Sequence, residues 1–279
     1  MISKIKGFDC YDVELAEQND DFESKCYPVY QKYIPTNFWY QARNKIISNL
    51  LSQEQKKLLN KKINFLEIGC GNGFVLKHLK TKFPSFSFAG SDIYVEALSY
   101  AKQNNTADVL FFQYNLFKKN LNQHFDIIGC FDVLEHIQED ETAMANLRDL
   151  IVSDGLAIIT VPSDMALWSN NDVINKHKRR YTKAELTTKL EKAGFEILYM
   201  NHFVFLLYSL LRIKAKLQKR VTNEDLDEPS IDVAQQLNLK INAVLNAGFS
   251  LIMRIEILIM QLGCKFPFGS SLICLVKKK

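Results

Sequence analysis

Short apolar runs alternate along the middle of the chain with segments in which apolar residues recur at helical spacing. Ile63–Ile68 is an apolar run that ends at Gly69 and predicts a strand, and the segment 73–82 has the spacing of a helix. The same pattern predicts strands over 85–91, 108–112, 125–131, 156–161 and 195–200, and helices over 94–103, 139–151 and 183–193. Strands that alternate with helices in this way indicate a mostly parallel sheet with helices on both faces. We therefore expect a doubly wound α/β fold.

The two ends of the chain depart from this alternation. Residues 1–62 are aromatic-rich and predict an N-terminal helical cap in front of a core over 63–202. A helical insertion is expected over 203–269, and the apolar run 271–276 in the tail 270–279 predicts a strand that returns to the sheet as its seventh. Within the insertion, the pattern predicts an amphipathic helix with basic residues over 203–220 and an acidic loop over 223–232. A second helical segment is predicted over 233–262.

Composition and charge narrow the class of protein. The 279 residues are 47% hydrophobic and 24% charged, which is typical of a globular protein rather than a disordered or fibrous one. The net charge of +4 is only mildly basic. It falls short of the strongly basic surface of a dedicated nucleic-acid binder, so a nucleic-acid partner is not expected.

The cysteines and the apolar stretches indicate where in the cell the protein is expected. The six cysteines form no Cys-x-x-Cys pair, and Cys70 and Cys130 lie in apolar runs, so we predict free core residues. Met1–Glu14 has no apolar stretch of signal-peptide length, so we expect a cytoplasmic protein. The stretch 244–262 is nearly long enough to span a membrane, but Arg254 and Glu256 interrupt it and favour a buried or interface helix.

The first strand–helix connection carries three alternating glycines, Gly69, Gly71 and Gly73. Glycine allows a sharp turn and a close approach of a ligand to the main chain, and the helix N-terminus beyond offers free N–H groups. A dinucleotide fold requires a further glycine in Gly-x-Gly-x-x-Gly, but that position holds Phe74 or Leu76. Binding of a nicotinamide or flavin dinucleotide is therefore not predicted.

Asp92 follows the second predicted strand, nineteen residues after Gly73. A carboxylate at this place is positioned to accept hydrogen bonds from both ribose hydroxyls of a nucleoside. The structural alternative is a cap for the helix that begins near Tyr94, and the two roles are compatible.

These residues and two further motifs resemble a known family. The motifs are Glu67-x-Gly69-x-Gly71-x-Gly73 with Asp92, Phe125-Asp126-Ile127-Ile128, and Val133-Leu134-Glu135-His136-Ile137. Together they resemble the class I S-adenosylmethionine-dependent methyltransferases over about residues 36–200, and the Leu-Glu-His motif resembles a small-molecule branch. The resemblance implies a Rossmann-like fold, S-adenosyl-L-methionine as cofactor and methyl transfer as the activity. It is not specific for a substrate.

The resemblance also implies roles for single residues. The Gly69–Gly73 turn would hold the methionine part of the cofactor, with Glu67 also in the cofactor site. Asp92 would bind the ribose, with Ile93 beside the adenine. Asn115-Leu116 stands where the family commonly has an acidic residue facing the adenine amino group, so Asn115 would offer an uncharged acceptor there.

The segment 37–43 resembles an aromatic-plus-arginine element that folds over the cofactor in one branch of the family. Arg43 would meet the methionine carboxylate, because a guanidinium binds carboxylates in a fork, and Trp39 would lie beside it. The alternative is a helix with Trp39 in the core and Arg43 on a solvated face. Phe131, at the end of the fourth strand, would lie beside the sulfonium and the transferred methyl group.

Candidate catalytic residues follow the fourth and fifth strands. His136 is a candidate general base because it titrates near neutral pH and lies at the ligand-binding edge of the sheet, and a structural role in the following turn is the alternative. Glu135 would orient His136 or the cofactor amine. The segment 177–181 resembles a His-x-Arg-Arg-Tyr element, which would place His177, Arg180 and Tyr181 at the acceptor pocket. Its alternative is a solvated basic loop.

A metal site is a further alternative. Asp132-x-x-Glu135-His136, with His177 downstream, resembles the Glu-x-x-Glu-His spacing of metal-assisted quinone and small-RNA methyltransferases. Carboxylate and imidazole ligands suit a divalent ion. Asp132 replaces the first glutamate and shortens its reach, so we include no metal among the expected sites.

The sequence thus predicts a methyltransferase that O-methylates a small or amphiphilic acceptor by in-line transfer. An RNA methyltransferase stays open if the basic loop 176–180 adjoins a continuous basic face, as does a catalytically silent cofactor-binding protein. The helices within 203–262 would cover a lipophilic acceptor, form a homodimer face, touch a membrane surface or pack on the sheet domain.

Overall fold

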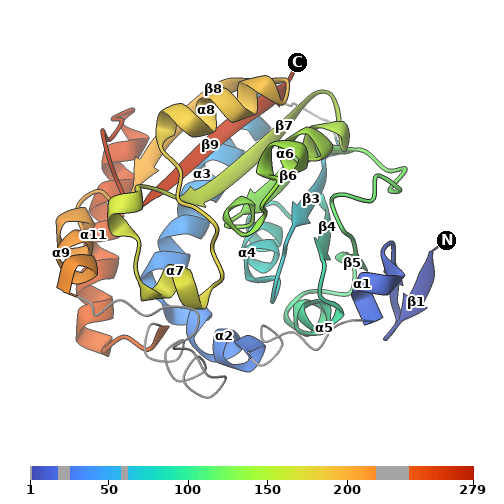
Figure 1. Ribbon diagram of the computed structural model, residues 1–279, viewed down its shortest axis with the longest axis horizontal. Coiled ribbons are helices and arrows are strands. Elements are labelled where there is room, and N and C mark those ends of the chain that lie inside the picture. Colours follow the sequence, from blue (N-terminus) through green and yellow to red (C-terminus); the bar gives the residue numbers. More distant parts are fainter. Residues whose placement is uncertain (1, 18–25, 58–61, 218–238) are drawn as a thin grey trace.

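A nine-stranded sheet forms the centre of the structure, a computed structural model that describes residues 2–17, 26–57, 62–217 and 239–279 (Figure 1). The strands lie in the order β1-β2-β5-β4-β3-β6-β7-β9-β8. Their bounds are Ser3–Ile5 (β1), Phe8–Cys10 (β2), Asn64–Ile68 (β3), Ser87–Asp92 (β4), Leu110–Gln113 (β5), Phe125–Phe131 (β6), Ile151–Pro162 (β7), Phe195–Phe203 (β8) and Ser271–Lys278 (β9). The helices are Val13–Glu17 (α1), Tyr27–Tyr33 (α2), Phe38–Lys57 (α3), Phe74–Lys82 (α4), Val95–Asn104 (α5), Asp140–Asp149 (α6), Asn170–Ile174 (α7), Lys183–Lys192 (α8), Tyr208–Leu217 (α9) and Ala243–Gln261 (α11).

The five central strands, β5, β4, β3, β6 and β7, pair in parallel. Leu66 of β3 pairs with Ala89 of β4 on one side and with Ile128 of β6 on the other. All seven residues of β6 are buried, as is usual for a parallel strand with helices on both faces. The predicted doubly wound, mostly parallel α/β fold is therefore confirmed.

The prediction of seven strands is wrong, because a hairpin near the N-terminus adds two more. Strand β2 extends the sheet beyond β5, with Cys10 opposite Gln113, and β1 pairs with β2. Lys6 and Gly7 between them have φ angles of 49° and 84°, as a tight two-residue hairpin turn requires. Residues 1–62 are therefore not wholly helical. Strands of three residues are too short to give a periodic pattern, which is why the sequence did not reveal them.

The last strand returns to the sheet as predicted. Strand β9 lies between β7 and β8 and is antiparallel to both, with Leu275 opposite Ile158 and Ile273 opposite Asn201. Strand β8 continues to Phe203, beyond the predicted 195–200, because its pairing with β9 extends as far as Ser271.

Helices cover the sheet on both faces (Figure 1). Helices α3, α4, α5 and α11 contribute to one buried apolar cluster, which includes Leu76, and α6 and α8 contribute to a second, which includes Leu147. Cys70 belongs to the first cluster and Cys130 to the second, and all six cysteines are free, as predicted.

The insertion contributes helices α9 and α11, whereas the predicted loop 223–232 lies outside the described residues. Helix α11 packs along α3 through a buried side that includes Met253, Ile257 and Met260. In the described part of the chain it is the one helix that is long and apolar enough to cross a membrane by length and composition. Only 22% of the tested stretch is buried, so much of this apolar helix faces outward.

Glu256 fastens α11 to the end of β8. Its carboxylate is completely buried and accepts hydrogen bonds from the backbone N–H groups of Val204 and Leu206, the latter at 2.9 Å. Burial raises the pKa of Glu256, and these N–H groups oppose the rise. Val204 has a φ of 60°, which is unfavourable for a β-branched residue. The carboxylate therefore holds a strained connection in place.

Replacing Glu256 by leucine should destabilise the protein, because a buried N–H group loses its acceptor. We expect Glu256→Leu to lower the free energy of unfolding by about 1–3 kcal/mol, measured by urea denaturation. Glu256→Gln, which keeps one acceptor oxygen, should cost less. A leucine variant as stable as the wild type would contradict the fastening role.

Candidate active site

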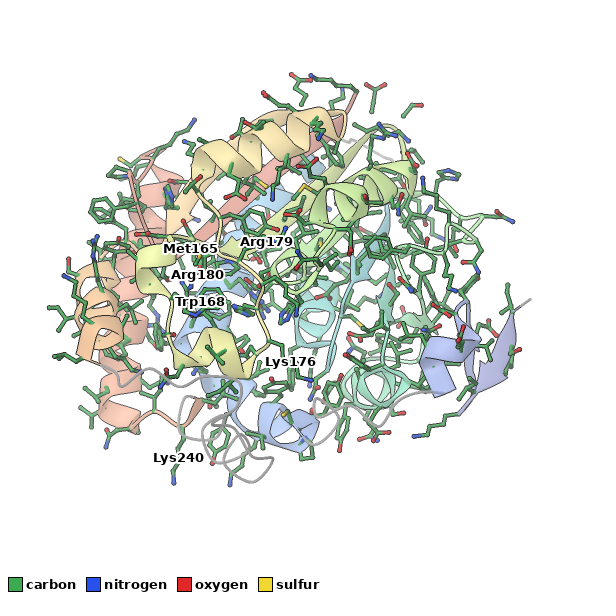
Figure 2. The ribbon with its side chains drawn as sticks, viewed as in Figure 1. Met165, Trp168, Lys176, Arg179, Arg180 and Lys240 are labelled. Atoms are coloured by element: carbon green, nitrogen blue, oxygen red, sulfur yellow. The ribbon has the colours of Figure 1, made fainter. Side chains whose placement is uncertain are left out.

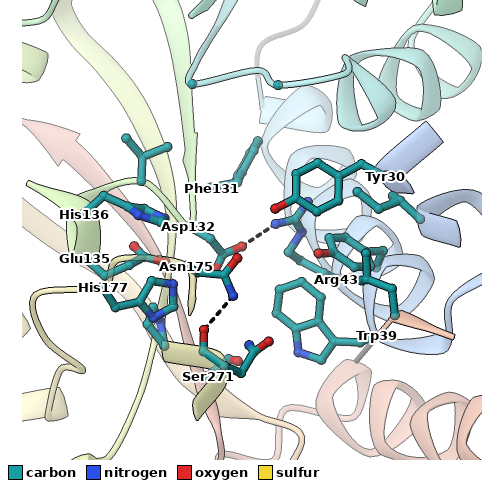
Figure 3. Close-up of a pocket in the computed structure, with 18 of the residues that line it drawn as sticks. Tyr30, Trp39, Arg43, Phe131, Asp132, Glu135, His136, Asn175, His177 and Ser271 are labelled. Atoms are coloured by element: carbon teal, nitrogen blue, oxygen red, sulfur yellow. Dashed lines mark hydrogen bonds and ion pairs between the residues drawn. The ribbon is translucent and has the colours of Figure 1, made fainter. Parts of the chain in front are cut away.

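A cavity of about 1080 Å³ opens at the carboxyl edge of the parallel strands (Figure 3). Doubly wound sheets bind ligands at this edge, and ligand sites are typically about 300–1,000 Å³, so there is room for a cofactor and an acceptor together. Figure 3 shows Trp39 and Arg43 on one side of the cavity and Glu135, His136 and His177 on the other.

The loop after β3 is shaped by its glycines, which have φ angles of 70°, 50° and 71° at Gly69, Gly71 and Gly73. A Cβ atom at Gly69 would lie 2.5 Å from Val133, and one at Gly73 would lie 2.6 Å from Asn105. A Cβ atom at Gly71 would meet nothing within 4 Å, and this residue lines the cavity. The backbone at Gly71 is therefore open to a ligand, as the motif predicted.

Asp92 braces this loop from the end of β4. Its Oδ2 accepts a hydrogen bond from the N–H of Gly71 at 2.8 Å, and its Oδ1 accepts one from the N–H of Tyr94 at 3.0 Å. Burial raises the pKa of Asp92, and these two hydrogen bonds oppose the rise. The side chain lines the cavity, so contact with a ribose remains a prediction compatible with its bracing role.

Glu67 is a second buried carboxylate in the cavity wall. It is 2% exposed, and its Oε2 has no hydrogen-bond partner among the described residues. Burial raises the pKa of Glu67 to about 8; the positive charge of Arg43 opposes this rise, and the negative charge of Asp92 adds to it. A ligand that brings positive charge would favour the ionised form. The sulfonium and ammonium groups of S-adenosylmethionine fit this requirement.

Arg43 lies in the cavity wall, not on a solvated face. Its guanidinium forms an ion pair with Asp132 and lies 5.1 Å from the ring centre of Trp39 and 5.3 Å from that of Tyr40. The side chain of Thr160 donates to the same oxygen of Asp132 at 3.0 Å. Nε of Arg43 has no partner among the described residues, so a cofactor carboxylate would share the guanidinium with Asp132.

The expected adenine end of the cavity includes Ile93, Asn115 and Leu116. The amide of Asn115 is already engaged: Nδ2 donates to Asp12 at 2.8 Å, and Oδ1 accepts from the N–H of Phe117 at 3.0 Å. The carboxylate that the family commonly has at this position is thus replaced by an amide tied to Asp12, which belongs to the N-terminal segment.

Asp172, which the sequence did not single out, holds two of the residues expected at the acceptor pocket. It is completely buried and accepts hydrogen bonds from Nδ1 of His177 at 2.9 Å and from Nε and Nη2 of Arg180 at 2.8 and 3.0 Å. Burial would raise the pKa of Asp172, but the hydrogen bond from His177 and the charge of Arg180 lower it to about 2. Arg180 lines the cavity, yet its fork is occupied by Asp172. The sequence pattern that could have drawn attention to Asp172 is Ser169-x-x-Asp172, which forms a capping box at the start of α7.

His136 and Glu135 lie on the same side of the cavity as His177. The His136 and His177 rings meet edge to face, with their centres 4.8 Å apart. Burial and the neighbouring His177 lower the pKa of His136 to about 3, so its ring is neutral at neutral pH. Glu135 is completely buried, and neither of its carboxylate oxygens has a hydrogen-bond partner among the described residues. Burial raises the pKa of Glu135 far above its usual range, and the charge of Asp132 adds to this.

This trio also has the chemistry of a metal site. Glu135, His136 and His177 offer ligand atoms that all lie within 4.8 Å of one another. A carboxylate without partners and a neutral imidazole suit a divalent cation. Asp132, the first residue of the motif in the sequence, is held by Arg43 and Thr160 and does not join this cluster of described residues.

Two of the predicted site residues do not line the cavity. Gly73 is closed off by Ala101 and Asn105. Tyr181 is completely buried in the second apolar cluster, where its hydroxyl donates to Asp140 at 2.7 Å. Its ring therefore supports the loop from behind, and the acceptor role suggested for it is not supported.

Sequence reasoning missed the part of α2 in the cavity wall, whereas it expected the helices within 203–262 as one possible cover of a lipophilic acceptor. Helix α2 contributes Tyr27 and Tyr30, and it is tied to the glycine loop because Nδ2 of Asn72 donates to the carbonyl of Tyr27 at 3.1 Å. Helices α9 and α11 contribute an apolar wall that includes Leu211 and Phe249. These contacts join distant parts of the chain and leave no local sequence pattern.

In a comparison with protein families, the family described as a methyltransferase domain matches residues 38–200 of the sequence, which is more than half of the chain. The chain belongs to this family of S-adenosylmethionine-dependent methyltransferases. The glycine loop, the open space at Gly71 and the Glu67 oxygen that has no partner in the described part of the chain agree with that assignment.

Curated relatives match the methyltransferase over part of their length. A ubiquinone biosynthesis O-methyltransferase from Rickettsia canadensis is 27% identical over 108 residues, which are 37% of this chain and 44% of the relative. A malonyl-[acyl-carrier protein] O-methyltransferase from Bacillus anthracis is 24% identical over 121 residues, 43% of this chain and 45% of the relative. The chain thus spans less than half the length of these two relatives.

Solved structures share the fold of the methyltransferase. A magnesium protoporphyrin IX methyltransferase from Synechocystis aligns with a TM-score of 0.54 at 13% identity, over 96% of this chain and 99% of that one. A sarcosine dimethylglycine methyltransferase candidate from Galdieria sulphuraria aligns with a TM-score of 0.55 at 13% identity, over 86% of each chain. At this identity the likeness concerns the fold alone.

Loss of the Asp92 carboxylate should weaken cofactor binding. We expect Asp92→Ala to cost about 1–3 kcal/mol in binding S-adenosylmethionine, because charge-assisted hydrogen bonds to the ligand and the brace on Gly71 are lost together. Isothermal titration calorimetry would measure the change, with thermal unfolding as the control for the fold. An unchanged dissociation constant would show that Asp92 serves the loop alone.

Proposed function

We propose that this methyltransferase transfers a methyl group from S-adenosylmethionine to a hydroxyl oxygen of a small, partly apolar acceptor. The observation that supports the proposal most strongly is the hydrogen bond between His177, which lines the cavity, and the buried Asp172 behind it. Methyl transfer from a sulfonium is an in-line displacement, so the protein has to align the acceptor and, for a hydroxyl, receive its proton. The carbon–sulfur bond breaks as the carbon–oxygen bond forms, and the demethylated cofactor leaves as a neutral thioether.

The pair supports His177 as the proton acceptor. With a pKa of about 2, Asp172 is ionised at neutral pH and only accepts hydrogen bonds, so Nδ1 of His177 carries the proton between them. In the neutral ring, Nε2 then holds the lone pair that takes a proton from the acceptor. His136, with a pKa of about 3, is a poor proton acceptor at neutral pH. We therefore assign proton transfer to His177. His136 stays neutral and packs against the His177 ring.

The cavity wall supports an acceptor with apolar surface. Leu210, Leu211, Leu245 and Phe249 of the insertion helices line the cavity together with residues of the sheet edge. Apolar side chains around a few placed polar groups are typical of small-molecule sites. Both of the curated relatives reported above are named O-methyltransferases, which also favours oxygen as the attacked atom.

The basic loop 176–180 gives little support to the RNA alternative. Arg179 forms an ion pair with Asp140 at 2.7 Å, and Arg180 is held by Asp172. The two arginines of this loop are thus used within the protein, and a small-molecule acceptor is the better supported class.

A divalent cation would add to this chemistry at a defined place. Glu135, His136 and His177 would hold it. A bound cation acts as a Lewis acid and lowers the pKa of a coordinated hydroxyl. His177 would then be a ligand and not the base, so the two roles are distinguishable.

Matched acceptors test the attacked atom. With phenols and anilines that share one carbon skeleton, we expect formation of the demethylated cofactor with the phenols and much less with the anilines, because proton removal by His177 converts a phenol into the more nucleophilic phenolate and gives a neutral aniline no such gain. Production of S-adenosylhomocysteine, followed by mass spectrometry, measures both. Preference for the anilines would contradict O-methylation, and turnover with neither would favour the catalytically silent alternative.

Removing the base should slow turnover and leave cofactor binding intact. We expect His177→Ala to lower kcat by about 10²–10⁴-fold, which is the usual contribution of a positioned base, with little change in the affinity for S-adenosylmethionine. His124→Ala, at an exposed histidine, is the matched control. If turnover is lost on dialysis against a chelator and returns with a divalent cation, His177 is a metal ligand instead. Wild-type turnover of the His177 variant would contradict both roles.

A further inference from the structure

Helices α9 and α11 expose apolar side chains in two regular rows. Along α11, Leu251, Ile255, Leu258 and Leu262 recur at steps of four, three and four residues, which places them on one side of the helix. They are 59%, 46%, 59% and 84% exposed. The opposite side, with Met253 and Ile257, packs on the protein core.

The second row repeats this spacing. Leu206, just before α9, and Leu210, Ile213 and Leu217 within it are 43%, 53%, 56% and 80% exposed. Leu210 of this row also lines the active-site cavity, as does Leu245 near the start of α11. The two rows are called here the outer apolar face, and the α9 row adjoins the cavity through Leu210. Soluble proteins rarely expose apolar side chains on this scale without a partner.

Within the described residues of α9 and α11, the exposed charges have one sign. The exposed charged residues of α9 and α11 are Arg212, Lys214, Lys216 and Arg254, and all are basic. The one acidic residue of these helices, Glu256, is buried and occupied by backbone N–H groups. Lys240, just before α11, points outward at the edge of the molecule (Figure 2).

We propose that the outer apolar face docks on the surface of a bilayer that contains anionic lipids. An amphipathic helix with a basic polar side lies in the plane of such a surface, with its apolar side in the acyl boundary. A second copy of the chain fits less well, because the self-contact would bring basic residues against basic residues. Insertion across the membrane is disfavoured, because α11 is packed along α3 and carries the buried, hydrogen-bonded Glu256.

The position of the cavity gives this docking a function. Because Leu210 and Leu245 belong both to the helices of the outer apolar face and to the cavity wall, an acceptor with a lipid tail reaches the cavity from the bilayer without crossing water. This last step rests on the proposed acceptor class, whereas the docking itself does not depend on methyl transfer.

Vesicle sedimentation of the full chain tests the docking. We expect the protein to sediment with vesicles of equal parts phosphatidylcholine and phosphatidylglycerol, less at high salt, and little with phosphatidylcholine alone. The double variant Leu251→Asp, Leu258→Asp should lower the apparent vesicle affinity by about tenfold or more, because carboxylates oppose entry into the acyl boundary. Leu110→Asp changes a leucine of equal exposure, 57%, on β5 and should bind like the wild type.

A charge-reversal variant and two controls keep the test decisive. Lys216→Glu with Arg254→Glu should weaken binding to the anionic vesicles without altering the apolar rows. Calorimetric binding of S-adenosylmethionine by each variant shows that the fold and the cofactor site persist. Equal vesicle binding by the wild type and both double variants would overturn the proposal. A concentration-dependent dimer in analytical ultracentrifugation, abolished by the aspartates and without vesicle binding, would assign the face to a second copy and also overturn it.

Discussion

Parallel pairing of β3 with both β4 and β6 is the constraint on which the site depends. It brings the ends of three strands to one edge, so that Gly71, Asp92 and Asp132 surround one cavity although they are distant in the sequence. The hydrogen bond from the N–H of Gly71 to Asp92 then fixes the glycine loop against the neighbouring strand. The rest of the site is arranged around this edge.

The carboxylates in the cavity wall suit a positively charged cofactor. Four carboxylates, those of Glu67, Asp92, Asp132 and Glu135, face the same space, and Arg43 is paired with one of them. Glu67 and Glu135 keep oxygens without partners among the described residues, and burial raises the pKa of both. Burying carboxylates in this way is costly unless positive charge arrives. A sulfonium cofactor, or a cation beside Glu135, brings that charge.

Helices α9 and α11 of the insertion contribute both to the cavity wall and to the outer surface of the protein. Glu256 ties α11 to the end of β8, so the helix keeps one side on the core. Its other side remains apolar and exposed, while residues near its start line the cavity. The same pair of helices thus contributes both to the cavity wall and to an exposed apolar surface.

The sequence by itself determined the features that depend on local pattern. Alternating apolar runs and helical spacing predicted the doubly wound core, and the glycines with Asp92 indicated where the cofactor is expected, because turn geometry and strand ends are encoded within a few residues. Only the tertiary structure decided which side chains meet. Asp172 orients His177, Arg43 pairs with Asp132, and Tyr181 is buried behind its loop. The short hairpin of β1 and β2 likewise exists because β5 offers it an edge. The partner of a buried charge, or of a three-residue strand, is set by distances between segments far apart in the chain, and periodicity along the sequence carries no record of those distances.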